Sequence, residues 1–152
     1  MLLSELLTTA RVKVPLGGRT KVEVLRELVE LVAAENADAD VEAILASVRE
    51  REDLLSTGIG GGIAIPHGKT PQVARLTLVA GVASEGIEYD ALDGEPVRLF
   101  FLLVGPESAS GAHVKTLSRI SRMLRREDLR AQLANAASPD AFVGVIRSSE
   151  PE

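Results

Sequence analysis

The sequence predicts an α/β fold of three layers, in which a β-sheet is covered by helices on both faces. Two segments, Leu76 to Ala83 and Val97 to Val104, are nearly continuous apolar runs. Such runs are typical of strands that are buried on both sides. Segments with the 3.6-residue periodicity of helices come before and after this block of strands. A sheet between two groups of helices accounts for both observations.

The N-terminal part predicts a short strand followed by a helix. Val12 and Val14 alternate with charged residues and are followed by proline, a pattern that indicates a strand. Thr20 with Glu23 three residues later is a capping-box sequence, which marks the start of a helix. The apolar residues of this helix recur at helical spacing and are Val24, Leu25, Leu28, Leu31 and Val32.

Further helices are predicted on either side of the strands. Asp38 or Asp40 can cap the second helix, which runs into the charged stretch around Arg51. Its apolar face is Val41, Ile44, Leu45 and Val48. After the strands, the apolar stripes are Val114, Leu117, Ile120 and Leu124, then Leu129 and Leu133. Ser138-Pro139 opens a last helix, because serine caps well and proline suits the first helical position.

Length and composition indicate one globular domain over residues 1–152. Apolar residues make up 45% of the chain and charged residues 26%, so the chain can bury a core and keep a solvated surface. The net charge of −5 and the 3% aromatic content argue against nucleic-acid binding. No signal peptide and no run long enough to span a bilayer is present, so we expect a cytoplasmic protein without membrane insertion.

The absence of cysteine excludes disulfides, thiolate zinc sites and cysteine nucleophiles. Two histidines are too few for a histidine-rich metal site, and we expect neither a metal nor a cofactor. Gly68-Lys69-Thr70 resembles the end of a P-loop, but the required earlier glycine is Ile63. A dinucleotide fingerprint beginning at Gly58 fails as well, because it lacks its third glycine and leads from helix to strand.

The remaining polar feature of this glycine-rich segment is His67. It follows a short apolar strand and Pro66, so we expect it at a strand end, where loops display functional groups. The surrounding string, R-E-x-x-x-S-T-G-I-G-x-G-I-A-I-P-H-G-K, resembles the signature of phosphotransferase-system enzyme IIA domains of the fructose, mannitol and nitrogen-regulatory group. The segments from Tyr89 to Val97 and around His113 extend the resemblance over essentially the whole chain. Gly61 departs from it, since relatives more often carry a polar residue there.

The resemblance implies the mixed-sheet α/β/α fold of those domains and a set of site residues. It assigns to His67 the acceptance of a phosphoryl group from a phosphohistidine of the carrier protein HPr or of its nitrogen-branch relative NPr. It places His113 beside His67 and assigns the signature arginine to Arg51. The residues expected to bind phosphate or to support the site are Gly68, Lys69, Thr57, Glu52 and Ser56.

The residue types suit this chemistry. Neutral imidazole is a nucleophile near pH 7, and an arginine can hold phosphate oxygens with two parallel hydrogen bonds. We expect His113, in the first turn of a helix, to donate to phosphoryl oxygens or to hold the tautomer of His67.

Two functions remain open after this assignment. One is a regulatory phosphocarrier of the nitrogen type, which the Tyr89–Asp93 pattern and the length of the chain favour. The other is a fructose- or mannitol-type IIA that passes the phosphoryl group to a IIB component for sugar uptake. A binding module without phosphorylation is disfavoured, because it would not need both histidines and Arg51.

Overall fold

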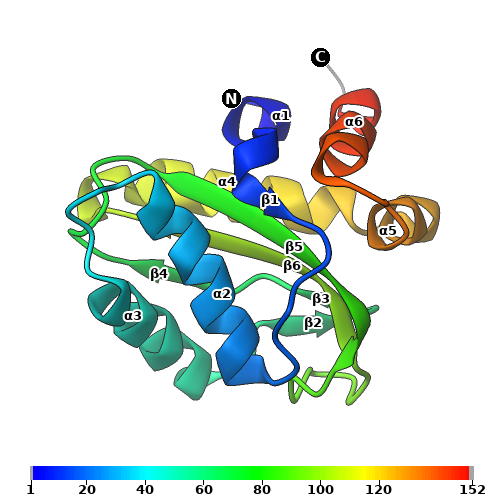
Figure 1. The fold of residues 1–152 in the computed structure, drawn as a ribbon, viewed down its shortest axis with the longest axis horizontal. Coiled ribbons are helices and arrows are strands. Elements are labelled where there is room, and N and C mark those ends of the chain that lie inside the picture. Colours follow the sequence, from blue (N-terminus) through cyan, green and yellow to red (C-terminus); the bar gives the residue numbers. More distant parts are fainter. Residues whose placement is uncertain (1, 151–152) are drawn as a thin grey trace.

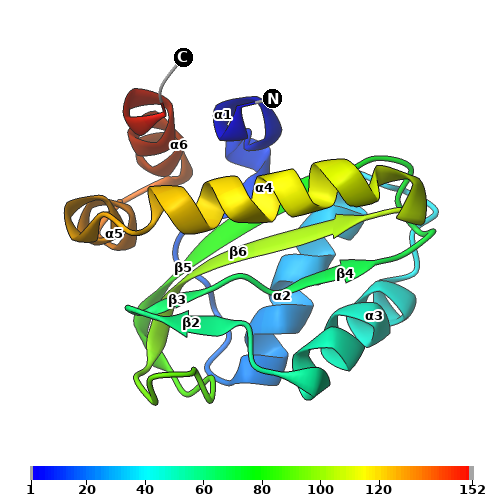
Figure 2. The same cartoon turned by 180° about the vertical axis from the view of Figure 1, so that it is seen from behind.

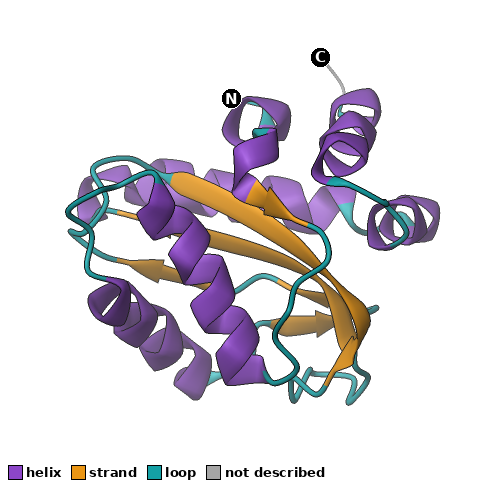
Figure 3. Cartoon of the chain, in the orientation of Figure 1, coloured by secondary structure: helices purple, strands orange, loops and turns teal. Residues whose placement is uncertain are grey.

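The computed structural model describes residues 2–150 (Figures 1 and 3). The helices are α1 (Leu3–Leu6), α2 (Lys21–Ala34), α3 (Val41–Leu54), α4 (Ser110–Met123), α5 (Glu127–Ala134) and α6 (Pro139–Ser149), with short 3₁₀ turns at Thr9–Arg11 and Glu107–Ala109. The strands are β1 (Val12–Lys13), β2 (Gly58–Gly60), β3 (Ile63–Ala64), β4 (His67–Lys69), β5 (Thr77–Ile87) and β6 (Val97–Gly105). The predicted helices and strands occur in the predicted order, and α1, β2 and β4 are additional elements. None of the helices within residues 2–150 has the length and apolar character that crossing a membrane requires.

The sheet is mixed, as predicted. Its order is β1-β5-β6-β3-β2, and β4 pairs with β6 farther along the same strand. The two long strands, β5 and β6, are antiparallel, while β1 runs parallel to β5 and both β3 and β4 run parallel to β6. Strand β2 closes the edge by pairing antiparallel with β3. The short strands β3 and β4 are therefore successive segments on one side of β6.

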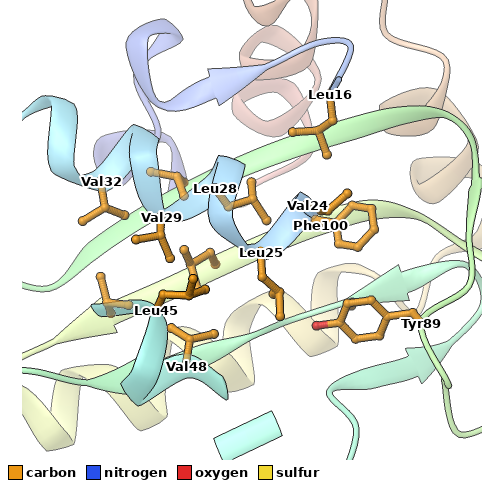
Figure 4. Packing of buried hydrophobic residues seen from close by; sticks show 14 of the residues in the cluster. Leu16, Val24, Leu25, Leu28, Val29, Val32, Leu45, Val48, Tyr89 and Phe100 are labelled. Atoms are coloured by element: carbon orange, nitrogen blue, oxygen red, sulfur yellow. The ribbon is translucent and has the colours of Figure 1, made fainter. Parts of the chain in front are cut away.

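Alternate side chains of β6 point into two separate cores. Phe100 and Leu102 pack with α2 and α3, whereas Phe101 and Leu103 pack with α1, α4, α5 and α6. Figure 4 shows the first core, in which residues of α2 are gathered with Leu45 and Val48 of α3, and Tyr89 lies at one edge. Figure 2 shows α4 crossing the opposite face of the sheet. Because both faces of β6 are covered, an almost uniformly apolar strand is stable there, which confirms the three-layer prediction.

The N-terminal ends of α2 and α3 have the predicted capping residues, but α2 lacks the complete capping box. Thr20 caps α2 by accepting from the backbone N–H of Glu23 at 3.2 Å. The carboxylate of Glu23 accepts from the N–H of Arg19 at 2.9 Å, instead of the Thr20 N–H that a capping box uses. Helix α3 is capped by Asp40, which accepts from two backbone N–H groups of its first turn, so Asp38 is not the capping residue.

One predicted apolar stripe is partly wrong. Ile120 in α4 and Leu124, the residue directly after the helix, are buried as expected, but the side chain of Val114 is 64% exposed. The buried positions in the first half of α4 are instead His113 and Thr116. The face of α4 that meets the sheet therefore changes from apolar to polar toward the N-terminus of the helix. This change places a histidine against the sheet and leaves Val114 at the surface.

Candidate functional site

His67 is the first residue of β4. The chain leaves β3 after Ala64, passes Ile65 and Pro66, and pairs again with β6, where His67 lies opposite Leu103. His67 therefore lies at a strand end, as expected, but at the start of β4 and not directly after β3. Pro66 has no N–H to donate to a sheet, so it occupies the break between two pairings with β6. After this break, the pairing of β4 with β6 fixes the position of His67 on the sheet.

The local backbone determines which ring nitrogen of His67 carries the proton. Its Nδ1 lies 2.9 Å from the carbonyl oxygen of Ile65. A carbonyl can only accept a hydrogen bond, so the proton of the neutral ring is on Nδ1 and Nε2 keeps its lone pair. Burial lowers the pKa of His67, and the hydrogen bond to Ile65 opposes this effect. The positive charge of Arg51 lowers the pKa further, while the negative charge of Glu52 raises it. The ring is therefore a neutral nucleophile near pH 7.

His113 projects from the first turn of α4 toward the same place. Its ring and that of His67 lie edge to face, with centroids 5.6 Å apart and planes at 66°. The residue is only 3% exposed, and its Nδ1 is buried without a hydrogen-bond partner in the described part of the chain. Burial, together with the charges of His67 and Lys69, lowers the pKa of His113 to about 4. Both imidazoles are therefore neutral at pH 7.

A pocket of about 430 Å³ opens beside the two histidines. Its polar lining includes Arg51 and Lys69, and its apolar lining includes Leu54 and Val114. Leu54 and Val114 are 80% and 64% exposed, so the pocket is bordered by apolar side chains that face solvent. Arg51 lies in the last turn of α3, where its Nη1 donates to the carbonyl oxygen of Leu55 at 2.7 Å. The structure thus brings Arg51, His67 and His113 together.

Gly68 lies against the backbone of α3, whereas the side chain of Lys69 lies at the edge of the pocket. An added Cβ on Gly68 would lie 3.2 Å from backbone atoms of Ser47 and Val48 in α3. The absence of a side chain therefore lets β4 pack directly on the helix that carries Arg51. Lys69 lies at the end of β4, lines the pocket, and is 3.8 Å from Glu107.

Ser56, Thr57 and Glu52 lie behind the pocket. The hydroxyl oxygen of Ser56 accepts from the N–H of Gly58 at 3.1 Å, which is a local turn contact. Glu52 is buried, accepts from the N–H of Thr57 at 2.9 Å and from the Thr57 hydroxyl, and forms an ion pair with Lys21 at 2.9 Å. These residues do not line the pocket and form part of its support.

Two residues of this support were missed in the sequence. The hydroxyl of Tyr89 lies 3.0 Å from the Thr57 hydroxyl. The ammonium group of Lys21 donates to the Tyr89 carbonyl at 3.1 Å and lies 4.3 Å from the centre of its ring. Nothing near Lys21 in the sequence points to Glu52. Tyr89 did carry a usable signal, because the chain has a single tyrosine and a buried tyrosine hydroxyl needs a partner.

The glycine turn between β2 and β3 explains the departure at Gly61. Gly60, Gly61 and Gly62 all have positive φ, at 96°, 69° and 80°. The N–H of Gly61 donates to a carboxylate oxygen of Asp93 at 3.1 Å, and an added Cβ would lie 3.2 Å from Nε of Arg130. Asparagine is one of the few other residues that adopt this backbone conformation. Glycine at 61 therefore keeps the turn while making room for Arg130.

Comparison with known proteins agrees with the geometry. The profile of the family described as phosphoenolpyruvate-dependent sugar phosphotransferase system, EIIA 2, matches residues 5–149. The chain is 39% identical to a nitrogen regulatory protein of Pseudomonas aeruginosa, over 95% of this chain and 94% of that protein. It is 37% identical to a fructose-specific EIIABC component of Bacillus subtilis, over 99% of this chain but only 24% of that protein.

A solved structure of the nitrogen regulatory protein IIA-Ntr from Neisseria meningitidis has the same fold. It superimposes with a TM-score of 0.88 at 28% identity, over 95% of this chain and 98% of that one. The resemblance inferred from the signature around His67 is thereby confirmed. This chain belongs to the EIIA 2 family of the phosphoenolpyruvate-dependent sugar phosphotransferase system.

Proposed function

We propose that this protein is a phosphotransferase component that carries a phosphoryl group on Nε2 of His67, within a single IIA domain. The donor is a phosphohistidine of an HPr- or NPr-like carrier protein. The observation that supports this most strongly is the hydrogen bond from Nδ1 of His67 to the Ile65 carbonyl, because it leaves Nε2 as the nucleophilic atom. The pocket beside that ring offers space for the donor's phosphoryl group.

The transfer step needs no proton movement between the two proteins. The donor phosphohistidine carries a proton on its second ring nitrogen. The lone pair of His67 Nε2 attacks phosphorus as the P–N bond of the donor breaks, and the electron pair of that bond returns to the donor ring, which leaves as neutral imidazole. His67 then carries the phosphoryl group on Nε2 and keeps its proton on Nδ1. The ring becomes cationic, and the Ile65 carbonyl and the phosphoryl oxygens stabilise that positive charge.

The neighbours of His67 stabilise the phosphoryl group. Arg51 is always ionised and can bind two phosphoryl oxygens, and Lys69 adds a second positive charge at the edge of the pocket. Neutral His113 can donate an N–H to the same oxygens. Because phosphoryl transfer spreads negative charge over these oxygens, positioned donors account for most of the expected rate enhancement.

We favour a regulatory role of the nitrogen type, in which the phosphorylation state alters binding to target proteins. The match to a nitrogen regulatory protein over nearly its whole length supports this reading. The alternative is a fructose- or mannitol-type IIA that passes the group to a IIB component for sugar uptake. The similarity to a fructose-specific component supports that alternative.

Incubation with a phosphorylated HPr-type carrier tests the phosphoryl acceptor. Wild-type protein should gain acid-labile phosphate, and the His67→Ala variant should gain none. Label that persists in His67→Ala would refute the assignment. Offering the phosphorylated protein to a set of IIB components separates the two roles, since rapid onward transfer to any of them would argue against a purely regulatory function.

A further inference from the structure

A buried polar cluster lies outside the pocket and connects four segments of the chain. It consists of Lys21 at the start of α2, Glu52 in the last turn of α3, Thr57 before β2, and Tyr89 in the loop after β5. We call it the Glu52 cluster. Tyr89 is fully buried, and Glu52 and Thr57 are 6% and 3% exposed. Such a cluster of buried polar groups is costly unless every member is paired, so its pairing fixes the geometry closely.

Glu52 is the centre of this cluster. One carboxylate oxygen accepts from the N–H of Thr57 and pairs with Lys21, both at 2.9 Å, and the other accepts from the Thr57 hydroxyl. Since the Thr57 hydroxyl donates its only proton to Glu52, the Tyr89 hydroxyl donates to the Thr57 oxygen. Burial alone would raise the pKa of Glu52, but the bonds from Thr57 and Lys21 hold it below its ordinary value. The carboxylate is therefore ionised and accepts bonds only.

Two hydrogen bonds lead from Thr57 through the backbone of Ile65 to the imidazole of His67. The Thr57 carbonyl accepts from the N–H of Ile65 at 3.0 Å. The carbonyl of the same Ile65 residue accepts from Nδ1 of His67 at 2.9 Å. The N–H of Ile65 is thus fixed by its hydrogen bond to Thr57, and the carbonyl of Ile65 fixes the ring of His67. A shift of Thr57 would turn the Ile65 carbonyl away from the ring.

We propose that Glu52 is a positioning residue that, through Thr57 and Ile65, keeps the proton of His67 on Nδ1 and directs Nε2 into the pocket. The inference rests on the proposed function for its catalytic consequence, but the tautomer itself is a property of the unphosphorylated protein. Glu52 follows Arg51 directly in α3, so the same anchor ties the arginine end of the helix to the segment that leads through β2 and β3 to His67. Lys21 and Tyr89 hold the carboxylate and the threonine in place.

The Glu52→Gln variant tests this proposal, with Asp53→Asn as its matched control. Both remove one negative charge from the same end of α3, but Asp53 is exposed and outside the cluster. A glutamine has a single acceptor oxygen and cannot accept from both groups of Thr57 and from Lys21 at once. The ¹⁵N chemical shifts of the two ring nitrogens report the tautomer of His67 without any phosphoryl donor. We expect a mixture of tautomers in Glu52→Gln and unchanged shifts in Asp53→Asn.

The rate of phosphoryl acceptance should also fall in Glu52→Gln and stay unchanged in Asp53→Asn. Because misplacement of a reacting group by about 1 Å can cost about a hundredfold, we expect the initial rate of Glu52→Gln to fall roughly tenfold to a hundredfold. His67 should remain the labelled residue. A folded Glu52→Gln protein whose ring nitrogens match those of Asp53→Asn would overturn the proposal, even if its melting temperature had fallen.

Tyr89→Phe provides the test if Glu52→Gln does not fold. The change keeps the ring in the core and removes only the hydroxyl that donates to Thr57. We expect a smaller tautomer shift in the same direction, and wild-type ¹⁵N shifts in this variant would count against the cluster. Failure of the proposed function looks different: label would persist in His67→Ala, while the tautomer comparison would still read out the role of Glu52.

Discussion

His67 and His113 lie edge to face, with ring centroids 5.6 Å apart, on elements that belong to different parts of the chain. His67 is held on the sheet by the pairing of β4 with β6, and His113 on α4 by burial against that sheet. A charged His67 ring disfavours protonation of His113, since two cations at this distance repel, and burial lowers the pKa of both rings. The pair therefore stays neutral near pH 7 and supplies one nucleophile and one N–H donor. The following predictions test these roles.

Replacement of His113 should separate stability from function. Leucine at 113 removes a buried Nδ1 that has no partner, and such a group costs about 1–3 kcal/mol. We expect the free energy of unfolding of His113→Leu to equal that of the wild type or to exceed it by about 1 kcal/mol. The rate of phosphoryl acceptance should fall roughly a hundredfold, as for loss of one positioned donor. Urea denaturation and initial rates measure the two effects.

Ile120→Val, on the same helix, is a control in which we expect stability to fall and phosphoryl acceptance to stay unchanged. Ile120 is fully buried, so loss of a methylene should cost about 1 kcal/mol while phosphoryl acceptance stays nearly unchanged. A His113→Leu protein that is clearly less stable than Ile120→Val would show that His113 has a structural partner.

Stability should depend on pH through His113. Its pKa is about 4 in the folded protein and about 6.5 when unfolded, so the unfolded state binds more protons between these values. The stabilisation is fully present above pH 6.5 and is lost as the pH falls toward about 4, with a total on the order of 3 kcal/mol. Denaturation curves at several pH values measure it. In His113→Leu this loss should be absent, and an identical pH dependence in both proteins would refute the assignment.

Arg51 should affect both the rate and the pH profile of phosphoryl acceptance. Burial and the charge of Arg51 lower the pKa of His67, so Arg51→Gln should raise that pKa. Since only the neutral ring is a nucleophile, the acid limb of the rate profile should move to higher pH in the variant. The NMR titration of His67 should move with it. Arg126→Gln, a change of an exposed arginine paired with Asp128, should leave both unchanged.

Close packing of β4 on α3 predicts a marked effect at Gly68. In Gly68→Ala the new Cβ would lie 3.2 Å from the backbone of Ser47 and Val48, and strand and helix must move apart. We expect a loss of about 1–3 kcal/mol in unfolding free energy, with slower phosphoryl acceptance because Arg51 moves relative to His67. Gly144→Ala in α6 meets nothing within 4 Å and should stabilise the protein by about 0.5–1 kcal/mol. Equal effects of the two changes would contradict this account.

Local interactions made much of the architecture predictable. Ser138 caps α6 and Pro139 occupies its first turn, as the dipeptide indicates, because both effects depend only on neighbouring backbone groups. The long apolar strands were predicted for a related reason: only a strand covered on both faces is stable with an almost uniformly apolar sequence. His67 and Arg51 were assigned from the signature and His113 from the wider family resemblance, and the structure places all three at one pocket.

The sequence by itself determined which segments become helices or long strands and which histidine follows the glycine turn. The tertiary structure alone decided that His67 begins β4, since a three-residue strand exists only because β6 offers it a partner. It also decided that Lys21 pairs with Glu52 and that Val114 faces solvent. These outcomes depend on contacts between residues far apart in the sequence. Such contacts form only when the chain folds, and no local pattern of residues predicts them.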